Sequence, residues 1–457
     1  MSSRSGGLLE LVARGKKDIF FTSNPQISFF NSVYTRCAPF SKEIYIGKPR
    51  NNPEWGRYVD FDIEHRGDIL HRSYLRIQLP TWLPMELRGI NETGVITDMS
   101  GVSYGYTNEV GFFMIDKIQY FNDNVLLCES FGTHMDWRLK QTYEFGTIGV
   151  YADQVGHRGE TGVEIARSVG STLRVPLLML GSQRLGEPGL PLTALRGARY
   201  RIRVHLRPYS DVLVASDGRL KPNPFGMRLK VQAVQGGALD TSQVSFQPVC
   251  MKNLEISLES TYLFLPNDVN AWLKAATLRF PFRHVQQQIF TLDDNIMNAA
   301  AQGVTANLPL ALDYSGPVDR LLIGIRSEAN SLSGQLNVLT PPGGGTFINS
   351  MRLNIANLDR IKSWSVDVFR DVATYWKNKS LAFNEVYTVA FGGFDYNEPS
   401  GTVSFTRAVL PTLYFVLAST AYDTRNISRK AYAIVYAESW NIYEIGGGTG
   451  RLMFDDS

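Results

Sequence analysis

The feature that most constrains the fold of this chain is an alternation of apolar and polar residues in many short segments. Residues 58–64 alternate apolar and acidic side chains, and residues 200–207 alternate apolar side chains with Arg or His. A period of two residues places one face of a segment in a core and the other in solvent, as in a half-buried β-strand. The same kind of pattern predicts strands at residues 115–121, 125–127, 254–258, 351–355, 364–368 and 432–436.

Helical signals are few. A short amphipathic helix can form at residues 8–12, and Asn267 with Asp268 predicts a short N-capped helix after Pro266. Gly (40 residues) and Pro (21 residues) punctuate the strands, a pattern that is typical of sandwiches and barrels. Because 457 residues exceed one ordinary core, we expect two all-β domains with their junction near residues 265–275.

Composition excludes several classes of protein. A net charge of +3 gives no basic stripe for coating nucleic acid, and an aromatic content of 12% argues against disorder. Cys37, Cys128 and Cys250 lie far apart, which argues against a disulfide framework or a zinc site and favours a reducing compartment. Charged residues break the apolar N-terminal segment, so we expect no signal peptide. Pro411 interrupts the longest uncharged apolar stretch, residues 408–422, so we expect no transmembrane helix.

A weak internal repeat favours duplication. In each half a strand precedes an acidic-Pro turn, at residues 187–189 and 398–401, and further strands follow. Such turns are common in all-β proteins, so the repeat alone is weak evidence for duplication.

The opening stretch, residues 18–30, joins two aromatic runs through a break at Pro25, which biases Asn24 towards an extended backbone. This stretch resembles the start of the major capsid proteins of nucleocytoplasmic large double-stranded DNA viruses, which infect algae and amoebae. The resemblance returns in the expected order over most of the chain, at residues 6–34, 115–137, 175–204, 351–360, 399–407 and 431–450.

The resemblance implies an all-β fold of two tandem eight-stranded jelly-roll sandwiches with a few short helices. The expected division is an N-terminal arm (1–25), a first jelly roll (26–265), a linker (266–275), a second jelly roll (276–445) and a C-terminal tail (446–457). Residues 208–237 look like an insertion. Residues 295–316 and 330–345 look like loops on the outer surface of the second domain.

The resemblance also implies a structural function. We expect homotrimeric, pseudo-hexagonal capsomers that tile the icosahedral capsid of a virion assembled in the host cytoplasm. Expected partners are neighbouring capsomers, minor capsid proteins contacted by the N-terminal arm, and surface glycans, with no direct contact to nucleic acid. The sequons at Asn91, Asn378 and Asn426 are weak glycan signals, because no secretory signal leads them to the ordinary host pathway.

Two alternatives belong to other classes. The first is a lectin-like, carbohydrate-binding jelly-roll surface protein with a platform of Trp82, Trp364 and Trp376, although packing of these rings in a core or interface is the favoured interpretation. The second is a double jelly-roll hydrolase, for which the chain offers no active-site constellation.

Motifs that could carry chemistry have simpler structural interpretations. Residues 101–105 match a nucleophile elbow but lack its flanking strand and helix. His65 and His71 flank an Arg-Gly-Asp tripeptide without zinc spacing, and we expect a tight turn in which Gly67 takes a positive φ. Residues 446–450 lack the spacing of a dinucleotide loop, which favours a flexible or turn-forming tail. We therefore expect no catalytic, cofactor-binding or metal-binding residues, and no enzyme.

Overall fold

A computed structural model describes residues 39–79, 89–90, 96–97, 104–142, 154–156, 165–166, 172–183, 187–215, 227–230, 245–248, 254–301, 307–332, 334–341, 344–378, 385–393, 400–418 and 430–454. The chain divides into two compact units, Met1–Pro39 and Phe40–Ser457. The elements below all belong to the second unit. The expected N-terminal helix and arm lie outside the described residues.

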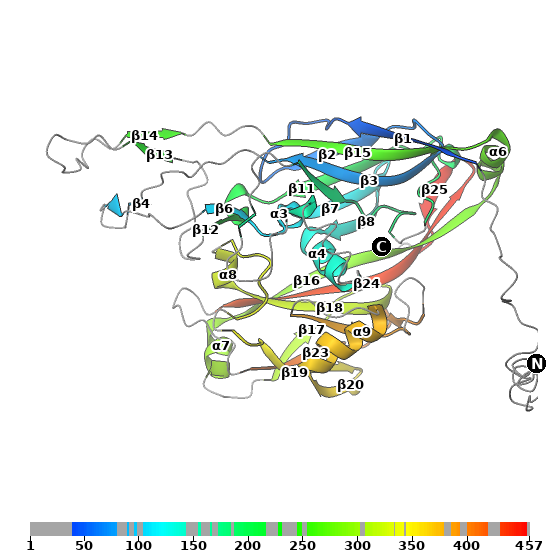
Figure 1. Cartoon of the computed structure of the whole chain (residues 1–457). Helices are drawn as coiled ribbons and strands as arrows, with labels where there is room; N and C mark the ends of the chain where they lie inside the picture. The colour runs from blue at the N-terminus through cyan, green and yellow to red at the C-terminus, as the bar shows by residue number, and fades with distance from the viewer. Residues whose placement is uncertain are drawn as a thin grey trace, which may run out of the picture. The chain divides into compact units, whose positions relative to one another are not determined.

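The first sandwich contains two four-stranded antiparallel sheets (Figure 1). The outer sheet has the order β1 (Ser41–Gly47), β15 (Glu255–Phe264), β3 (Ile69–Gln78) and β10 (Thr172–Pro176). The facing sheet has the order β2 (Tyr58–Ile63), β11 (Tyr200–Leu206), β7 (Ile115–Asn122) and β8 (Val125–Phe131). We call the first of these sheets the Ile46 sheet, because Ile46 lies on its exposed face.

The second sandwich repeats this design. Its first sheet has the order β16 (Leu278–Leu292), β24 (Ala431–Gly446), β18 (Pro317–Ser327) and β21 (Val386–Ala390). The facing sheet has the order β17 (Asn307–Ala311), β23 (Thr412–Leu417), β19 (Ile348–Ile355) and β20 (Leu358–Ser365). We call the first of these the Glu438 sheet.

The two sandwiches have the same connectivity. When the eight main strands of each half are counted along the chain, one sheet has the order first, eighth, third, sixth, and its partner has the order second, seventh, fourth, fifth. This order, with every neighbouring pair antiparallel, is that of a jelly roll built from two Greek keys. The expected fold class, two tandem eight-stranded jelly rolls with a few short helices, is confirmed.

Shorter helices and strands connect the main strands of the two sandwiches. The helices and helical turns are α3 (Val110–Phe113), α4 (Gly132–Thr142), η1 (Leu192–Ala194), η2 (Tyr209–Val212), α6 (Asn267–Ala275), α7 (Asp294–Ala301), α8 (Glu328–Leu332), η4 (Val368–Val372, a π-helical turn) and α9 (Ala373–Asn378). The short strands are β4 (Gly89–Ile90), β5 (Ile96–Thr97), β6 (Tyr104–Thr107), β9 (Ile165–Ala166), β12 (Leu213–Ala215), β13 (Met227–Lys230), β14 (Ser245–Pro248), β22 (Val403–Ser404) and β25 (Thr449–Leu452).

Each sandwich closes over its own apolar core, because alternate residues of facing strands point inward. Leu75, Val175 and Ile202 are fully buried in the first core. Leu321 and Phe415 are fully buried in the second. One end of the β16–β24 strand pair departs from this division, since its Phe282, Tyr443 and Ile445 pack in the first core.

The helix predicted at Asn267 is confirmed as α6, which separates the last strand of the first sandwich from the first strand of the second. Its N-cap is Pro266, and no side chain caps it, so the capping role assigned to Asn267 was wrong. The carboxylate of Asp68 instead secures this end by accepting hydrogen bonds from the backbone N–H of Leu265 at 2.8 Å and from Asn270 Nδ2.

The loop predicted at 295–316 was wrong. Residues 294–301 form α7, in which Asp294 supplies a favourable acidic first turn, and β17 follows. The loop predicted at 330–345 is not an outer surface loop throughout, because Leu336 and Leu339 are each only 4% exposed. The Asn and Gly residues in these short segments interrupt the spacing of apolar residues from which a helix or strand is predicted.

One further prediction needs correction. The strand predicted at 364–368 ends at Ser365, and Val368 begins the π-helical turn η4. Residues 446–449 form a turn, which is one of the two alternatives expected for this segment, and β25 then pairs with β24. Gly447 and Gly448, with φ of 62° and 87°, make this tight reversal possible.

Candidate functional site: the contact between the two jelly rolls

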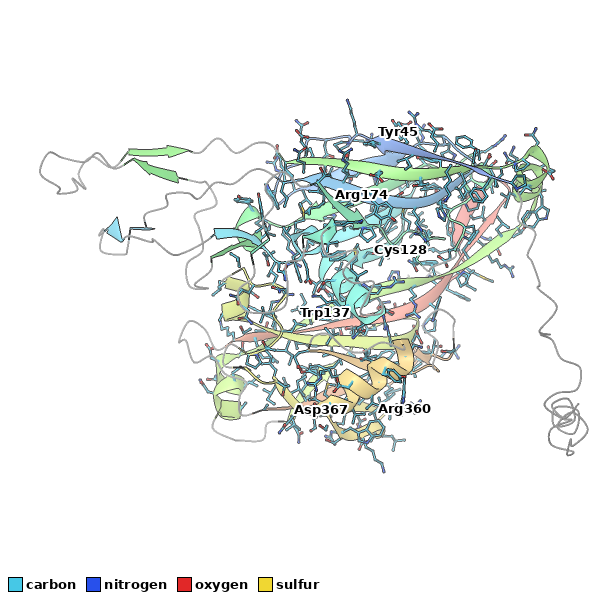
Figure 2. The ribbon with its side chains drawn as sticks, viewed as in Figure 1. Tyr45, Cys128, Trp137, Arg174, Arg360 and Asp367 are labelled. Carbon is cyan, nitrogen blue, oxygen red and sulfur yellow. The ribbon has the colours of Figure 1, made fainter. Side chains whose placement is uncertain are left out.

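Helix α4 of the first jelly roll covers the outer face of the Glu438 sheet (Figure 2). Its Trp137 is 1% exposed and meets the ring of Tyr436 edge-on, with 5.3 Å between centroids. Gly324 on β18 leaves room for this indole, since a Cβ there would lie 2.5 Å from the Trp137 ring. The other apolar residues of this contact are Phe131, Val285, Leu322, Leu339, Val386 and Ile434.

A buried charge cluster lies beside this apolar contact. Arg320 donates to both carboxylate oxygens of Glu438, at 2.7 and 2.9 Å, and Arg283 donates to the same carboxylate. Helix α4 joins the cluster through His134 Nε2, which lies 2.7 Å from Glu438 Oε1. All four side chains are 3% exposed or less.

Asp319 extends the cluster to helix α9. Arg283 Nη2 lies 3.1 Å from one of its oxygens, and Lys377 Nζ lies 2.8 Å from the other. Lys377 also donates to the carbonyl of Gly393 at 3.2 Å. Burial lowers the pKa of the Lys377 amine, and the hydrogen bond to Asp319 works against that decrease.

The electrostatics favour an ionised Glu438 and a neutral His134. Burial alone would raise the pKa of Glu438, but the charges of Arg320 and Arg283 outweigh it and hold that pKa well below its usual value. Burial lowers the pKa of His134, even though its bond to Glu438 opposes this. We therefore assign a hydrogen bond from neutral His134 to Glu438, not an ion pair, because two guanidinium groups already neutralise the carboxylate.

A second buried group of charges lies within the first jelly roll. Lys140 Nζ lies 2.7 Å from Glu109 and 3.2 Å from Asp136, which is 2% exposed. Burial and then the charge of Glu109 raise the pKa of Asp136 to about 8. At neutral pH, Asp136 therefore carries a proton that it shares with the neighbouring carboxylate.

The same end of the β16–β24 strand pair makes another contact with the first jelly roll. Asn122 Nδ2 lies 3.2 Å from the hydroxyl of Tyr443 and 3.0 Å from the carbonyl of Gly450. Tyr200 also bonds to Tyr443 through its hydroxyl. The polar and apolar contacts together hold the two jelly rolls in one arrangement, because each buried partner would be costly to expose or leave unpaired.

The histidines singled out in the sequence do not converge. His65 Nε2 lies 3.2 Å from the carbonyl oxygen of Ala198, and His71 Nδ1 lies 3.0 Å from that of Pro188. Each ring is therefore held by a separate backbone group, as expected for residues with a structural role.

The Arg-Gly-Asp tripeptide is also structural. Arg66 pairs with Glu64 at 2.7 Å, and Asp68 secures α6. The positive φ predicted for Gly67 was wrong. Glycine is instead required for close approach, since a Cβ at this position would lie 2.8 Å from Tyr262 Cβ.

Other motifs fall partly outside the described residues, among them the elbow at 101–103, Trp82, Cys37 and Cys250. Cys128 is buried, which raises the pKa of its thiol. Within the described ranges, no group of three His, Cys, Asp or Glu side chains could hold a metal ion. No helix among the same residues is long and apolar enough to cross a membrane.

No member of the buried charge cluster was predicted from the sequence. One signal was available, because Glu438 is a lone acid that follows a run of mostly apolar residues, 431–437. A single charge inside an otherwise buried strand predicts a buried partner. Its partners, however, come from positions 134, 283 and 320, which no local pattern connects.

The fold and this buried contact define a tandem double jelly-roll protein. No family model matches the chain. It is 29% identical to the major capsid protein of Pyramimonas orientalis virus over 99% of this chain and 100% of that protein. It is 23% identical to the major capsid protein of Paramecium bursaria Chlorella virus 1, over 98% and 99% of the two chains.

A solved structure shows the same fold. The chain matches the crystal structure of PBCV-1 VP54, fitted into a reconstruction of the virophage Sputnik, with a TM-score of 0.67. That match covers 94% of this chain and 100% of the other at 16% identity, so it shows a shared fold. The chain is a homologue of the major capsid proteins of large double-stranded DNA viruses and has the double jelly-roll fold.

Proposed function

We propose that this chain is a major capsid protein that forms the outer shell of a large DNA virus. One observation carries the proposal: the chain aligns with a major capsid protein over 99% of its own length and 100% of the other's. The double jelly roll, with the same strand order in both halves, supports it. Both observations favour a structural role over the lectin-like alternative.

The capsomer is a homotrimer. Two sandwiches in each chain give six similar blocks in a trimer, and six similar blocks make a near-hexagonal outline that tiles a flat face. Capsomers then meet their neighbours through many weak contacts, which sum to a stable shell while each remains reversible during assembly.

The chain divides into an arm (1–25), a first jelly roll (26–265), a linker (266–275), a second jelly roll (276–445) and a C-terminal segment (446–457). The arm faces the virion interior and binds minor capsid proteins. The opposite end of the capsomer carries surface glycans. Assembly takes place in the host cytoplasm.

The chain acts without catalysis and without a cofactor. The charged groups of the buried cluster between the jelly rolls are engaged with one another, as in the bonds of Glu438 to Arg320 and Arg283. This arrangement supports a mechanical role, in which the cluster holds the two jelly rolls at a fixed angle.

Native mass spectrometry of the purified full chain tests the proposal. Each chain has a mass of 51.2 kDa, and we expect a species of three chains that persists on dilution. A chain that remains monomeric at all concentrations would contradict the capsomer. The same sample should form sheets or shells when concentrated, as seen by electron microscopy.

A further inference from the structure

A histidine is sealed inside the contact between the two jelly rolls. His134 lies on α4 and is 0% exposed, and its Nε2 lies 2.7 Å from Glu438 Oε1. Its ring also lies against that of Tyr436, with 5.2 Å between centroids. The unperturbed pKa of a histidine is about 6.5, so this side chain can change its charge near neutral pH. Any such change acts directly on the contact that holds the two jelly rolls together.

The second ring nitrogen of His134 has no place for a proton. In the neutral ring, Nε2 carries the hydrogen that it donates to Glu438, and Nδ1 is then an acceptor. Nδ1 is buried and has no hydrogen-bond partner among the residues that the structure describes. Protonation would turn it into a donor to which those residues offer no acceptor. Because a buried donor without a partner is destabilising, the closed contact suits the neutral ring better than the charged one.

The charges around His134 also oppose a further positive charge. Five charged side chains from four elements form the cluster: Glu438 of β24, Asp319 and Arg320 of β18, Arg283 of β16 and Lys377 of α9. Three of them are cations and two are carboxylates, so the cluster carries one excess positive charge. A protonated His134 would double that excess among side chains that are all 3% exposed or less. Arg138, on α4 itself, opposes protonation as well.

Three other titratable groups at this contact keep their charge between pH 7 and pH 5. Asp136 has a pKa of about 8 and is already protonated. Burial opposes the charge of Lys140, but Asp136 and then Glu109 of α3 outweigh it and raise its pKa. Glu438 stays ionised, because its pKa lies well below the usual value. A change in the contact over this range of pH therefore reports on His134.

From this geometry we infer that His134 is an acid-sensitive latch between the two jelly rolls. The neutral ring holds α4 on the Glu438 sheet. On acidification the open contact takes up a proton that the closed contact excludes, and α4 leaves the sheet more often. The latch belongs to the single chain, so it does not depend on the capsid function. In a shell built from such chains, acid would loosen every unit.

The direction of the effect follows from linkage. Burial lowers the pKa of His134 in the closed contact, whereas the open contact returns the ring to water and to a pKa of about 6.5. The stabilisation is therefore complete above about pH 6.5 and is lost as the pH falls below it. For one proton, the ratio of open to closed contact rises by up to about tenfold for each pH unit in that range.

Hydrogen exchange of the full chain, followed by mass spectrometry, tests the latch. Helix α4 has eleven residues, and so short a helix is marginal in water, so its amides should lose protection when it leaves the sheet. The wild type is compared with His134→Gln, whose amide can still donate to Glu438 but cannot take up a proton. Comparison at the same pH cancels the intrinsic pH dependence of exchange. From pH 7.0 to pH 5.0 we expect exchange in α4 to accelerate in the wild type relative to the variant, by several-fold and by at most about thirtyfold.

His205→Gln is the matched control. Burial lowers the pKa of His205 too, but its Nε2 lies 2.9 Å from Gln119 Oε1, within a sheet of the first jelly roll. This variant should keep the acid response of the wild type. Peptides from β15 are the internal reference, because the Ile46 sheet lies on the side of the first sandwich away from α4 (Figure 1). Their exchange should not differ between the wild type and the variants.

Three outcomes would overturn the latch and leave the capsid function standing. The first is a ratio of α4 exchange rates, wild type to His134→Gln, that does not change with pH. The second is an acid response that His205→Gln abolishes. The third is an equal acceleration in α4 and β15, which would indicate global unfolding. If His134→Gln fails to fold by circular dichroism, the wild type decides alone: exchange in α4 must rise relative to β15 between pH 7.0 and pH 5.0, and a constant ratio overturns the latch.

Discussion

At the scale of single residues, stability depends most on the carboxylate of Glu438. Replacing it by the neutral amide in Glu438→Gln removes the negative charge that Arg320 and Arg283 share, and leaves Asp319 as the counter-charge of Arg283. Breaking one member of a buried ion pair typically costs about 3–5 kcal/mol, and we expect a loss of that size in denaturant unfolding. Glu54→Gln, which removes a pair with Arg57 at the surface, is the control and should change stability by less than about 1 kcal/mol. Equal effects of the two substitutions would contradict the importance of the cluster.

Asp136 should make stability depend on pH. Its pKa in the folded chain is about 8, well above the value of about 3.9 for an unfolded chain. Between these values the folded state holds a proton that the unfolded state has released, so this contribution to stability falls as pH rises. The neighbouring charges are Glu109 and Lys140 in direct contact, with Arg326 also nearby.

Melting curves of the wild type and Asp136→Asn measure this contribution. The variant cannot ionise at this position, so its melting temperature relative to the wild type should be higher at pH 8.5 than at pH 5.5. His134, whose pKa is lowered, acts in the opposite direction, because its contribution is lost as pH falls. The comparison with the wild type removes that effect. A difference between the two proteins that does not change with pH would show that Asp136 does not titrate in this range.

The contacts of individual residues were harder to predict from the sequence than the secondary structure or the fold. The spacing of His65 and His71 fits no zinc-binding pattern, and it therefore predicted that the two side chains do not form a metal site. The cluster around Glu438 did not follow, because its members come from α4, β16, β18 and β24 and only tertiary structure brings them together. Gly67 was also not predictable from local sequence. A glycine is needed there because Tyr262, which is distant in sequence, packs closely against it, and not because of the local backbone conformation.

At the scale of elements, the docking of α4 depends on the glycine beneath it. Gly324→Ala would place a methyl group 2.5 Å from the Trp137 ring, so α4 must shift or the ring must leave its rotamer. Overpacking of this kind costs about 1–3 kcal/mol, which thermal unfolding would detect. Gly47→Ala is the matched control, because the nearest atom to its added Cβ is 3.7 Å away. If Gly324→Ala proved as stable as Gly47→Ala, the contact would be looser than its geometry indicates.

Elements with a clear period of two were predictable. The alternation in residues 58–64 and 200–207 corresponds to β2 and β11, and the predicted strand at 115–121 corresponds to β7. Prediction failed where polar residues interrupt short elements, as in α7, or where the chain leaves a strand for a helical turn, as at η4. In these segments the tertiary contacts of the second sandwich, and not local propensity, decide the structure.

At the scale of the whole molecule, the resemblance of the sequence to capsid proteins is sufficient to predict the double jelly roll. The strand order of the two sandwiches follows from that resemblance and not from the strand patterns alone, because alternation does not specify which strands pair. The packing of α4 against the second sandwich required the structure, because the residues of this contact come from distant parts of the chain.

The N-terminal segment should be dispensable for the capsomer but not for the shell. Deleting residues 1–17 removes Leu8, Leu9, Leu11 and Val12, an apolar stripe that we propose binds minor proteins inside the virion. We expect trimers to form normally, because the two sandwiches of each chain supply the six blocks of the proposed capsomer. We expect shell assembly or minor-protein binding to be impaired. Gel filtration and electron microscopy report the two effects separately. Loss of the trimer itself would contradict this role for the arm.

Capsomer formation is the function that we propose for the chain, and single-particle cryo-electron microscopy of the purified full chain tests it most directly. We predict a ring of three chains and six sandwiches. A particle with a different number of chains, or a chain that remains monomeric at all concentrations, would contradict the proposal.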